Sequence, residues 1–285
     1  MMYAINRMIL ISKIRDMIIE ANTRLSEEVT CQIGNALKTE SEPLAKNVLE
    51  NILENQKIAR SLDLPLCQDT GVAVFFVRVG RELYFDYSLT EALNEATARA
   101  YREGYLRKSI VKHPLDRINT SDNTPAIIHL IETEGNQLDI MFAPKGGGSE
   151  NMSRLCMLTP AEGRQGIIDF VLETIKLAGG KACPPLIVGV GIGGNFEMCA
   201  LIAKEAIFRP LSDEASNPVD RELENELKEK INALDIGPMA LGGKTTCLAV
   251  KVNSHPCHIA SLPVAVNLQC HSARKSHLVI EGEKL

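Results

Sequence analysis

Hydrophobic patterning along the chain changes character near residue 65. Apolar residues recur at helical spacing over residues 8–60, and Ser41-Glu42-Pro43 predicts a helix start there, because proline fits a first turn. Later segments mix strand-like and helical patterns without a strict β-α-β alternation. The order predicts an α+β fold in one domain of residues 1–285, helical over 1–65 and built of mixed β-sheets flanked by helices over 66–285.

Local signals define the elements expected after residue 65. Runs of β-branched and aromatic residues predict strands at 72–79, 126–132, 138–142, 186–190, 245–252 and 259–266. Helical patterns lie at 88–103, 160–178, 195–208 and 220–233. Because Gly135-Asn136 separates the second and third strands, we expect these two to pair as a hairpin.

Charge and hydropathy exclude several classes of function. Lys and Arg number 31 against 36 Asp and Glu, a net charge of −5 without any basic run, which argues against a nucleic-acid partner. The longest apolar runs, such as 184–192, fall far short of the roughly 20 residues that span a bilayer. The charged N-terminus carries no cleavage-site pattern. We therefore expect a cytoplasmic protein with small molecules or proteins as partners and no membrane contact.

The cysteines suggest a reducing compartment. They lack the dense spacing of a small secreted scaffold, and no pair forms C-x-x-C, so any metal site must gather ligands from distant parts of the chain. Their positions are 31, 67, 156, 183, 199, 247, 257 and 270. Cys199 and Cys247 lie in an apolar helix and an apolar strand and are expected to be buried as small hydrophobic residues.

Two glycine-rich segments invite a nucleotide interpretation. Residues 189–194, GVGIGG, match a dinucleotide-binding loop, but the acid expected about 20 residues later falls in a loop, so close backbone packing at a strand end is favoured. Residues 241–246, LGGKTT, resemble the end of a phosphate-binding loop, but Pro238 stands where that loop needs glycine. Anion binding and simple turn formation remain open for Lys244.

Two other loops could carry chemistry. In residues 143–151, APKGGGSEN, successive glycines let backbone N–H groups converge on an anion, although a flexible turn would have the same composition. In residues 67–71, CQDTG, the aspartate could form an Asx turn before Gly71 or act as a functional acid. Cys183, before Pro184-Pro185, and Cys270, after a strand, also lie on irregular segments.

In combination these motifs resemble the α, or N-terminal, part of the class I iron-sulfur fumarate hydratase and L-tartrate dehydratase family. The resemblance covers most of the chain and implies the fold of an iron-sulfur fumarase N-terminal domain. The motifs that carry it are CQDTG at 67–71, LRKS at 106–109, PLD at 114–116, N-T-x-x-N-x-P at 119–125, KGGGSEN at 145–151, ACPP at 182–185, LGGKTT at 241–246 and CHSAR at 270–274.

The resemblance implies a 4Fe-4S cluster held by Cys67, Cys183 and Cys270. Three protein thiolates leave one iron of the cluster without a protein ligand, and this iron can act as a Lewis acid on the hydroxyl of a 2-hydroxy dicarboxylic acid.

Roles for the residues that face the substrate follow from the same resemblance. Arg107 would bind a carboxylate, Asp69 would act as the acid/base group, and Gln68 and the glycine loop around Gly147 would contact the substrate.

The chain stops at Leu285, soon after the third cysteine motif, which resembles the two-subunit arrangement of the family. We therefore expect a β subunit, an α2β2 assembly and a hydro-lyase that converts fumarate to malate, with L(+)-tartrate dehydration to oxaloacetate as the alternative. A nicotinamide-dependent oxidoreductase using residues 189–194 and a non-enzymatic iron-sulfur sensor are less favoured readings.

Overall fold

The computed structural model describes residues 2–285, which divide into two units, each assembled from segments far apart in the sequence. The first unit comprises the residues up to Leu25 together with Ile58–Gly147 and Arg274–Leu285. The second comprises Ser26–Lys57 and Gly148–Ala273. The expectation of a single domain over the whole chain stays a prediction.

The first unit is built on a four-stranded sheet in the order β10-β5-β2-β4. Strand β2 is central because apolar residues cover both of its faces, and it pairs antiparallel with β5 and parallel with β4. The strands are β2 (Val72–Gly80), β4 (Ile127–Thr133), β5 (Gln137–Lys145) and β10 (Ser276–Glu281). A small sheet, β11-β1-β3, joins β1 (Tyr3–Ala4), β3 (Leu83–Tyr84) and β11 (Glu283–Lys284).

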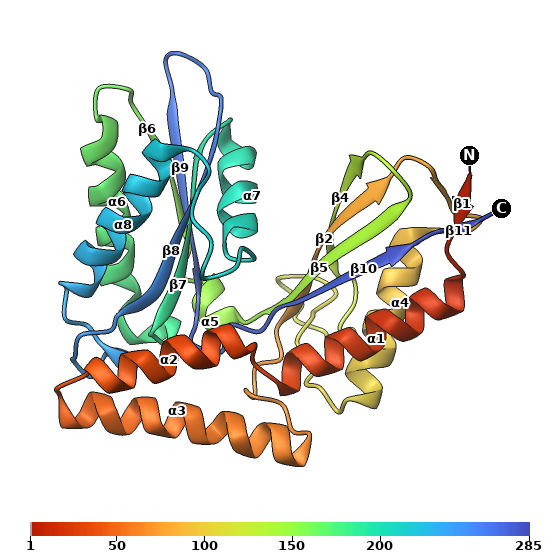
Figure 1. Ribbon diagram of the computed structural model, residues 1–285, viewed down its shortest axis with the longest axis horizontal. Coiled ribbons are helices and arrows are strands. Elements are labelled where there is room, and N and C mark those ends of the chain that lie inside the picture. The colour runs from red at the N-terminus through yellow and green to blue at the C-terminus, as the bar shows by residue number, and fades with distance from the viewer. Residues whose placement is uncertain (1) are drawn as a thin grey trace. The chain divides into compact units, whose positions relative to one another are not determined.

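Helices α1 (Arg7–Thr23) and α4 (Leu89–Glu103) pack against one face of this sheet (Figure 1). Both begin at polar caps, since the Asn6 side chain accepts from Met8 N and the Ser88 side chain accepts from Glu91 N. Their apolar faces and those of β2 and β5 form one buried cluster. This cluster is the core of the first unit, which also contains the loops of Asp69 and Arg107.

The expected hairpin between the strands near residues 126–132 and 138–142 is wrong. Both strands exist as β4 and β5, but β2 lies between them. The connection crosses the end of β2, where Arg81 N donates to Thr133 O and Glu82 N donates to Gly135 O. A Cβ at Gly80 would lie 2.4 Å from Gly135 O, so glycine permits this crossing. Tertiary burial of the largely apolar β2 overrides the local turn signal.

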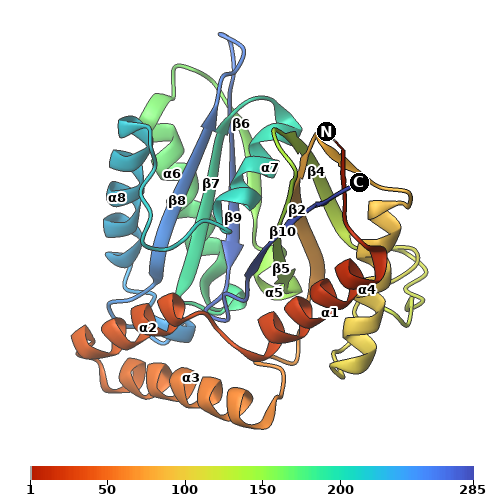
Figure 2. The same cartoon turned by 45° about the vertical axis from the view of Figure 1, so that its right-hand side comes forward.

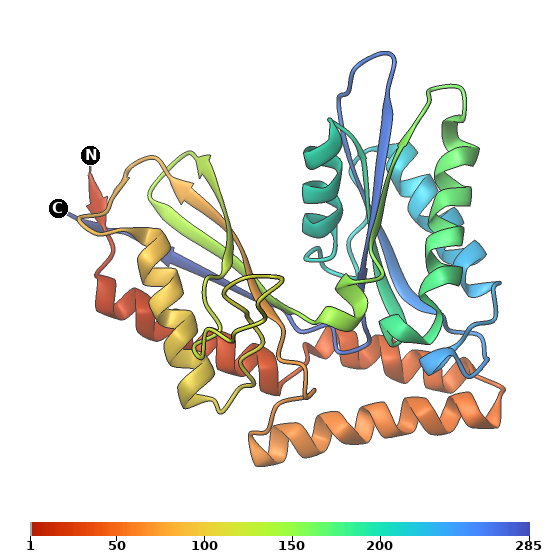
Figure 3. The ribbon, with the colours of Figure 1, turned by 180° about the vertical axis from the view of Figure 1, so that it is seen from behind.

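The second unit has three layers, with a sheet in the order β6-β9-β7-β8 between helices (Figures 1 and 3). Helix α7 (Phe196–Ala206) covers one face, and α6 (Gly163–Ala178) and α8 (Pro218–Asn232) cover the other. The strands are β6 (Arg154–Leu158), β7 (Leu186–Gly193), β8 (Cys247–His255) and β9 (Leu262–Gln269). Short helices are α5 (Gly147–Glu150), η1 (Gly179–Ala182) and η2 (Pro238–Ala240).

The N-terminal region contains more helices than its pattern resolved. The expected start at Pro43 is confirmed for α3 (Pro43–Leu62), but α2 (Glu27–Thr39) intervenes, capped by the Ser26 side chain. Thr30 Oγ1 donates to Gln56 Oε1, and the two helices run side by side (Figure 2). The α+β class is confirmed. Across residues 2–285, none of the helices combines the length and apolar character needed to cross a bilayer.

Candidate active site

Asp69 lies in the turn between α3 and β2, and its carboxylate is held from two sides. Oδ1 accepts a hydrogen bond from Gly71 N at 3.0 Å, which is the Asx turn that the motif allowed. Oδ2 accepts from Gly147 N at 2.7 Å. An amide of the glycine loop, expected to meet an anion, therefore donates to a carboxylate of the chain itself.

Two buried side chains fix the backbone of this turn. The Tyr101 hydroxyl donates to Thr70 O at 2.6 Å and lies 3.0 Å from Gly71 O. Asn123 Nδ2 donates to Gly71 O at 3.1 Å. Gly71 has φ 72°, and a Cβ there would lie 2.7 Å from the backbone of Lys145, so the turn requires glycine.

The same residues tie the Arg107 segment to the turn. Thr70 Oγ1 donates to Arg107 O at 2.7 Å, and Ser109 N donates to Asn123 Oδ1 at 2.6 Å. Asn123 thus bridges the two segments with both ends of its amide. The Arg107 side chain is exposed. The first unit therefore brings together Asp69, the Arg107 segment and Gly147.

Cys67 and Gln68 begin this turn. Cys67 is half-buried and Gln68 is exposed. Gly146 packs directly on the carboxylate, because a Cβ there would lie 3.0 Å from Asp69 Oδ2. The glycines of the loop thus allow the backbone to approach Asp69 closely.

The second unit brings together the segments of Cys183 and Cys270. Cys183 follows η1 in a left-handed conformation with φ 55°. His271 N donates to Cys183 O at 3.1 Å, and His271 Nδ1 lies 3.1 Å from the same oxygen. Cys270 follows β9, and its thiol lies 3.8 Å from Ser272 O. Both thiols are half-buried, on irregular backbone.

Two other cysteines behave as expected for core residues. Cys199 and Cys247 are fully buried. Burial raises the pKa of Cys247 to about 12 and also raises the pKa of Cys199. None of the cysteines within residues 2–285 forms a disulfide. Burial thus separates Cys199 and Cys247 from the loop cysteines.

The expected metal ligands are distributed over both units, with Cys67 in the first and Cys183 and Cys270 in the second. Within the described chain, no group of three or more His, Cys, Asp or Glu side chains stands assembled as a metal site.

The segment at residues 189–194 is explained by packing. Gly189 and Gly191 lie inside β7 rather than in a loop, on the face that meets α7. A Cβ at Gly191 would lie 2.0 Å from Cys199 O, and one at Gly189 would lie 2.2 Å from Ala203 O. Helix and strand approach so closely that no side chain fits between them.

The Gly243-Lys244 turn contacts the end of α2. Lys244 N donates to Glu40 Oε2 at 2.8 Å, and Lys244 Nζ donates to Thr39 O at 3.3 Å. The turn therefore binds a carboxylate of the chain itself, that of the buried Glu40.

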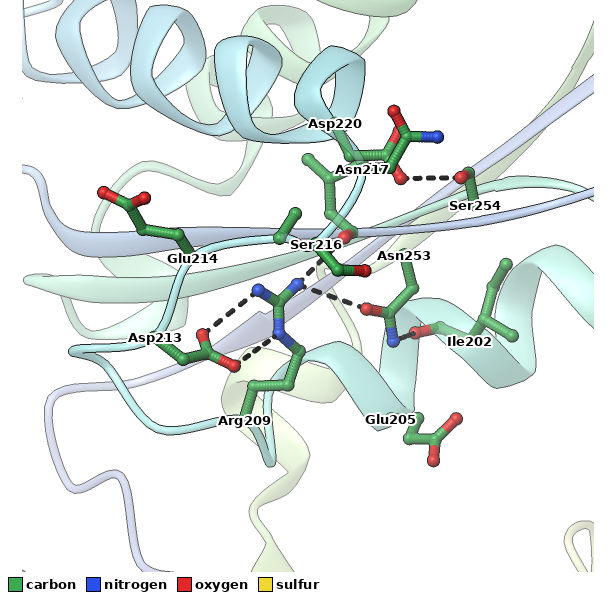
Figure 4. Close-up of a pocket in the computed structure, with 12 residues that line it drawn as sticks. Ile202, Glu205, Arg209, Asp213, Glu214, Ser216, Asn217, Asp220, Asn253 and Ser254 are labelled. Atoms are coloured by element: carbon green, nitrogen blue, oxygen red, sulfur yellow. Dashed lines mark hydrogen bonds and ion pairs between the residues drawn. The ribbon is translucent and has the colours of Figure 1, made fainter.

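A cavity of about 620 Å³ in the second unit is lined mainly by polar residues (Figure 4). Arg209 lies at its centre and donates to Asp213 and Glu224. Burial acts to raise the pKa of Asp213, but hydrogen bonds from Arg209 and Lys251 lower it. None of the residues expected to be catalytic lines this cavity, whose charged lining residues are four carboxylates and the Arg209 guanidinium.

Sequence reasoning gave no role to two residues that support the site, Tyr101 and Arg274. Tyr101 lies within the helix expected over 88–103, whereas Asn123 belongs to the 119–125 motif, whose segment was expected to shape a loop. Arg274 was part of the CHSAR motif without a role, yet it is only 2% exposed. The signal in the sequence was that Arg274 is a charged residue at the end of CHSAR, a motif of otherwise small and polar residues.

Comparisons with a family model and with individual known proteins point to the same family. The family model described as fumarate hydratase (Fumerase) matches residues 11–279. A Methanocaldococcus jannaschii protein, provisionally named L(+)-tartrate dehydratase subunit alpha, is 42% identical over 275 residues, which cover 93% of this chain and 96% of that protein. The L(+)-tartrate dehydratase subunit alpha of Escherichia coli K12 and that of Shigella sonnei are each 32% identical over 266 residues, which cover 92% of this chain and 88% of theirs. The chain belongs to the fumarate hydratase family of hydro-lyases.

Proposed function

We propose that this chain is the α subunit of a two-subunit hydro-lyase that reversibly hydrates fumarate to malate. A β subunit completes the enzyme as an α2β2 assembly in the cytoplasm. The observation that carries the proposal is the 2.7 Å hydrogen bond from Thr70 Oγ1 to Arg107 O. It ties the backbone of Arg107, an exposed residue, to the turn that carries the anchored Asp69 carboxylate, and a hydroxy acid needs such a pair for recognition and proton transfer.

Each of these residues has a physical role in the proposal. The Arg107 guanidinium binds one substrate carboxylate through two parallel N–H bonds. Asp69 exchanges a proton with the substrate, since each of its oxygens accepts one backbone amide and keeps a second lone pair. Gln68, which is exposed next to Asp69, hydrogen-bonds the substrate. Gly147 keeps the carboxylate oriented and lines the same site.

The donor set suits a 4Fe-4S cluster held by Cys67, Cys183 and Cys270. All three are half-buried thiols without disulfides, whereas burial raises the pKa of Cys199 and Cys247 and disfavours the thiolate that a metal needs. When bound, such a cluster supplies a Lewis acid at the iron that lacks a protein ligand.

L(+)-tartrate dehydration to oxaloacetate is the second candidate activity. The names of the relatives support it, since the M. jannaschii, E. coli and Shigella proteins are named for tartrate. Malate and tartrate differ by one hydroxyl group, and a site with a hydrogen-bond partner for that group can discriminate strongly between them.

The cluster is tested by iron and acid-labile sulfide after anoxic purification. We expect about four of each per native chain and a sharp loss in Cys183→Ser. Cys31→Ser is the matched control, because Cys31 is exposed on α2 and outside the ligand set. Native chain without iron and sulfide, even after anoxic reconstitution, would contradict the cluster.

The reaction is tested by mixing α and β chains and assaying fumarate, L-malate and L(+)-tartrate. Asp69→Asn should lower kcat by about 10²-fold or more, because it removes the acid/base group. Turnover by the α chain alone would contradict the need for a β subunit. A cluster-containing complex that turns over none of the three acids would favour the iron-sulfur sensor.

A further inference from the structure

Arg274 is a buried cation with little compensation. Its side chain is 2% exposed, and it belongs to the first unit. Nη1 donates to Asn22 Oδ1 at 3.2 Å, a neutral acceptor, and Nε has no hydrogen-bond partner among residues 2–285. Burying a charge without a counter-charge is strongly unfavourable, so a nearby anion is needed to explain this arrangement.

Asp69 is an acidic group that lies in its surroundings. A Cβ at Gly146 would lie 3.0 Å from Asp69 Oδ2 and 3.8 Å from Arg274 Nη2, so both groups border the same small glycine. Both charges also affect the pKa of the buried Tyr101 hydroxyl. Burial raises the pKa of Tyr101, Arg274 lowers it and Asp69 raises it again. The carboxylate and the guanidinium therefore act on one buried region.

The hydrogen bonds of Asp69 come from neutral groups, so its negative charge can still balance the charge of Arg274. Gly71 N and Gly147 N orient the carboxylate, but neutral amides do not cancel the charge of Arg274. Attraction between opposite charges acts over several ångströms in a buried, low-dielectric region. The charge of Arg274 thus complements the two amides that hold Asp69.

We propose that Arg274 is a positioning residue for Asp69, whose buried guanidinium is the counter-charge that holds the carboxylate against the Gly147 amide. Its catalytic consequence rests on the proposed function, in which Asp69 exchanges a proton with the substrate. A misplacement of about 1 Å can lower a rate about 10²-fold.

The charge pairing is tested without any activity, by thermal unfolding of the full-length chain. The set is native, Asp69→Asn, Arg274→Gln and the double variant. Asp69→Asn should lower Tm by roughly 5 °C or more in the native background, because it leaves the buried cation without its counter-charge. In the Arg274→Gln background the same substitution should lower Tm much less.

Ile140→Val is the control for this cycle. Ile140 is buried in β5, away from the glycine loop, so its effect on Tm should add to that of Asp69→Asn. If Asp69→Asn and Arg274→Gln also add, the two groups are not a pair and the proposal is overturned.

The positioning role is tested in the α–β complex by comparing Arg274→Lys with Arg274→Gln. Lysine keeps the charge and glutamine keeps polar donors without the charge. We expect glutamine to lower kcat about 10²-fold with little change in KM, and lysine to restore much of kcat. Iron and sulfide contents should equal those of the native chain.

Other outcomes of this assay have distinct meanings. Equal kcat values for the lysine and glutamine variants, or a change confined to KM, would overturn the positioning role. If the native complex turns over none of the three acids, the proposed function fails, and the unfolding cycle still decides whether Arg274 and Asp69 pair.

Discussion

At the scale of single residues, Asp69 shows how an acid and its turn depend on one another. Its two oxygens bind the amides of Gly71 and Gly147, which lie at the same end of the antiparallel β2–β5 pair, just before β2 and just after β5. Tyr101 and Asn123 hold the carbonyl of Gly71 from two further elements. The conformation of the turn therefore depends on groups that lie far away in sequence, and glycine at position 71 is its tightest requirement.

Gly71→Ala should destabilise the first unit strongly, because the new Cβ would lie 2.7 Å from the Lys145 backbone. We expect a loss of about 2–4 kcal/mol in the free energy of unfolding, from equilibrium denaturation in urea. Gly135→Ala is the control, since Gly135 has φ 88° but nothing within 4 Å of a Cβ. It should cost only about 1–2 kcal/mol of backbone strain. Equal losses would show that contact with Lys145 does not matter.

At the scale of elements, β7 explains a motif that resembled a nucleotide loop. Val188 and Val190 point into the cluster shared with α6 and α8, while Gly189 and Gly191 face α7. Side chains alternate between the faces of a strand, so one strand can present bulky residues to one helix layer and none to the other. Gly189 and Gly191 are two residues apart because both lie on the same face of the strand.

Gly191→Ala tests this close contact. The added Cβ would lie 2.0 Å from Cys199 O and force α7 away from β7. We expect a loss of about 3 kcal/mol or more in the free energy of unfolding. Gly34→Ala, at a half-buried position in the middle of α2 with nothing within 4 Å of a Cβ, should instead stabilise by about 0.5–1 kcal/mol. A Gly191→Ala chain as stable as the native one would contradict the packing argument.

At the scale of the whole molecule, polar anchors join segments that the chain separates widely. Glu40, at the end of α2, accepts from Ser41 N and Glu42 N and from Lys244 N. Burial acts to raise the pKa of Glu40, but these three backbone hydrogen bonds and the charge of Lys244 together outweigh it and lower the pKa below the ordinary 4.5. The start of α3 and the turn before β8 are thereby connected to one carboxylate.

This carboxylate predicts acid sensitivity. Because the folded-state pKa lies below the unfolded-state value near 4.5, its contribution to stability is present above pH 4.5 and is lost as pH falls through the folded-state pKa. Glu40→Gln should be less stable than the native chain at pH 7 by about 1–3 kcal/mol, and the difference should shrink below pH 4.5. The measurement is the free energy of unfolding from pH 7 to pH 3. Glu42→Gln, at an exposed neighbour, should show no such difference, and a pH-independent difference for Glu40→Gln would refute the linkage.

The sequence by itself determined the elements and the family. Helical and strand periodicities are local properties, so β2, α4 and α7 begin and end near the predicted residues, and the motif set points to one family. The family resemblance carried by those motifs also implied Asp69, Arg107 and the loop cysteines as candidates. Only the tertiary structure decided that β2 separates β4 from β5, because strand order depends on which faces are buried. It also decided that Gly147 binds Asp69 and that Arg274 lies buried near the same carboxylate, since hydrogen bonds and charges between distant segments have no period in the sequence.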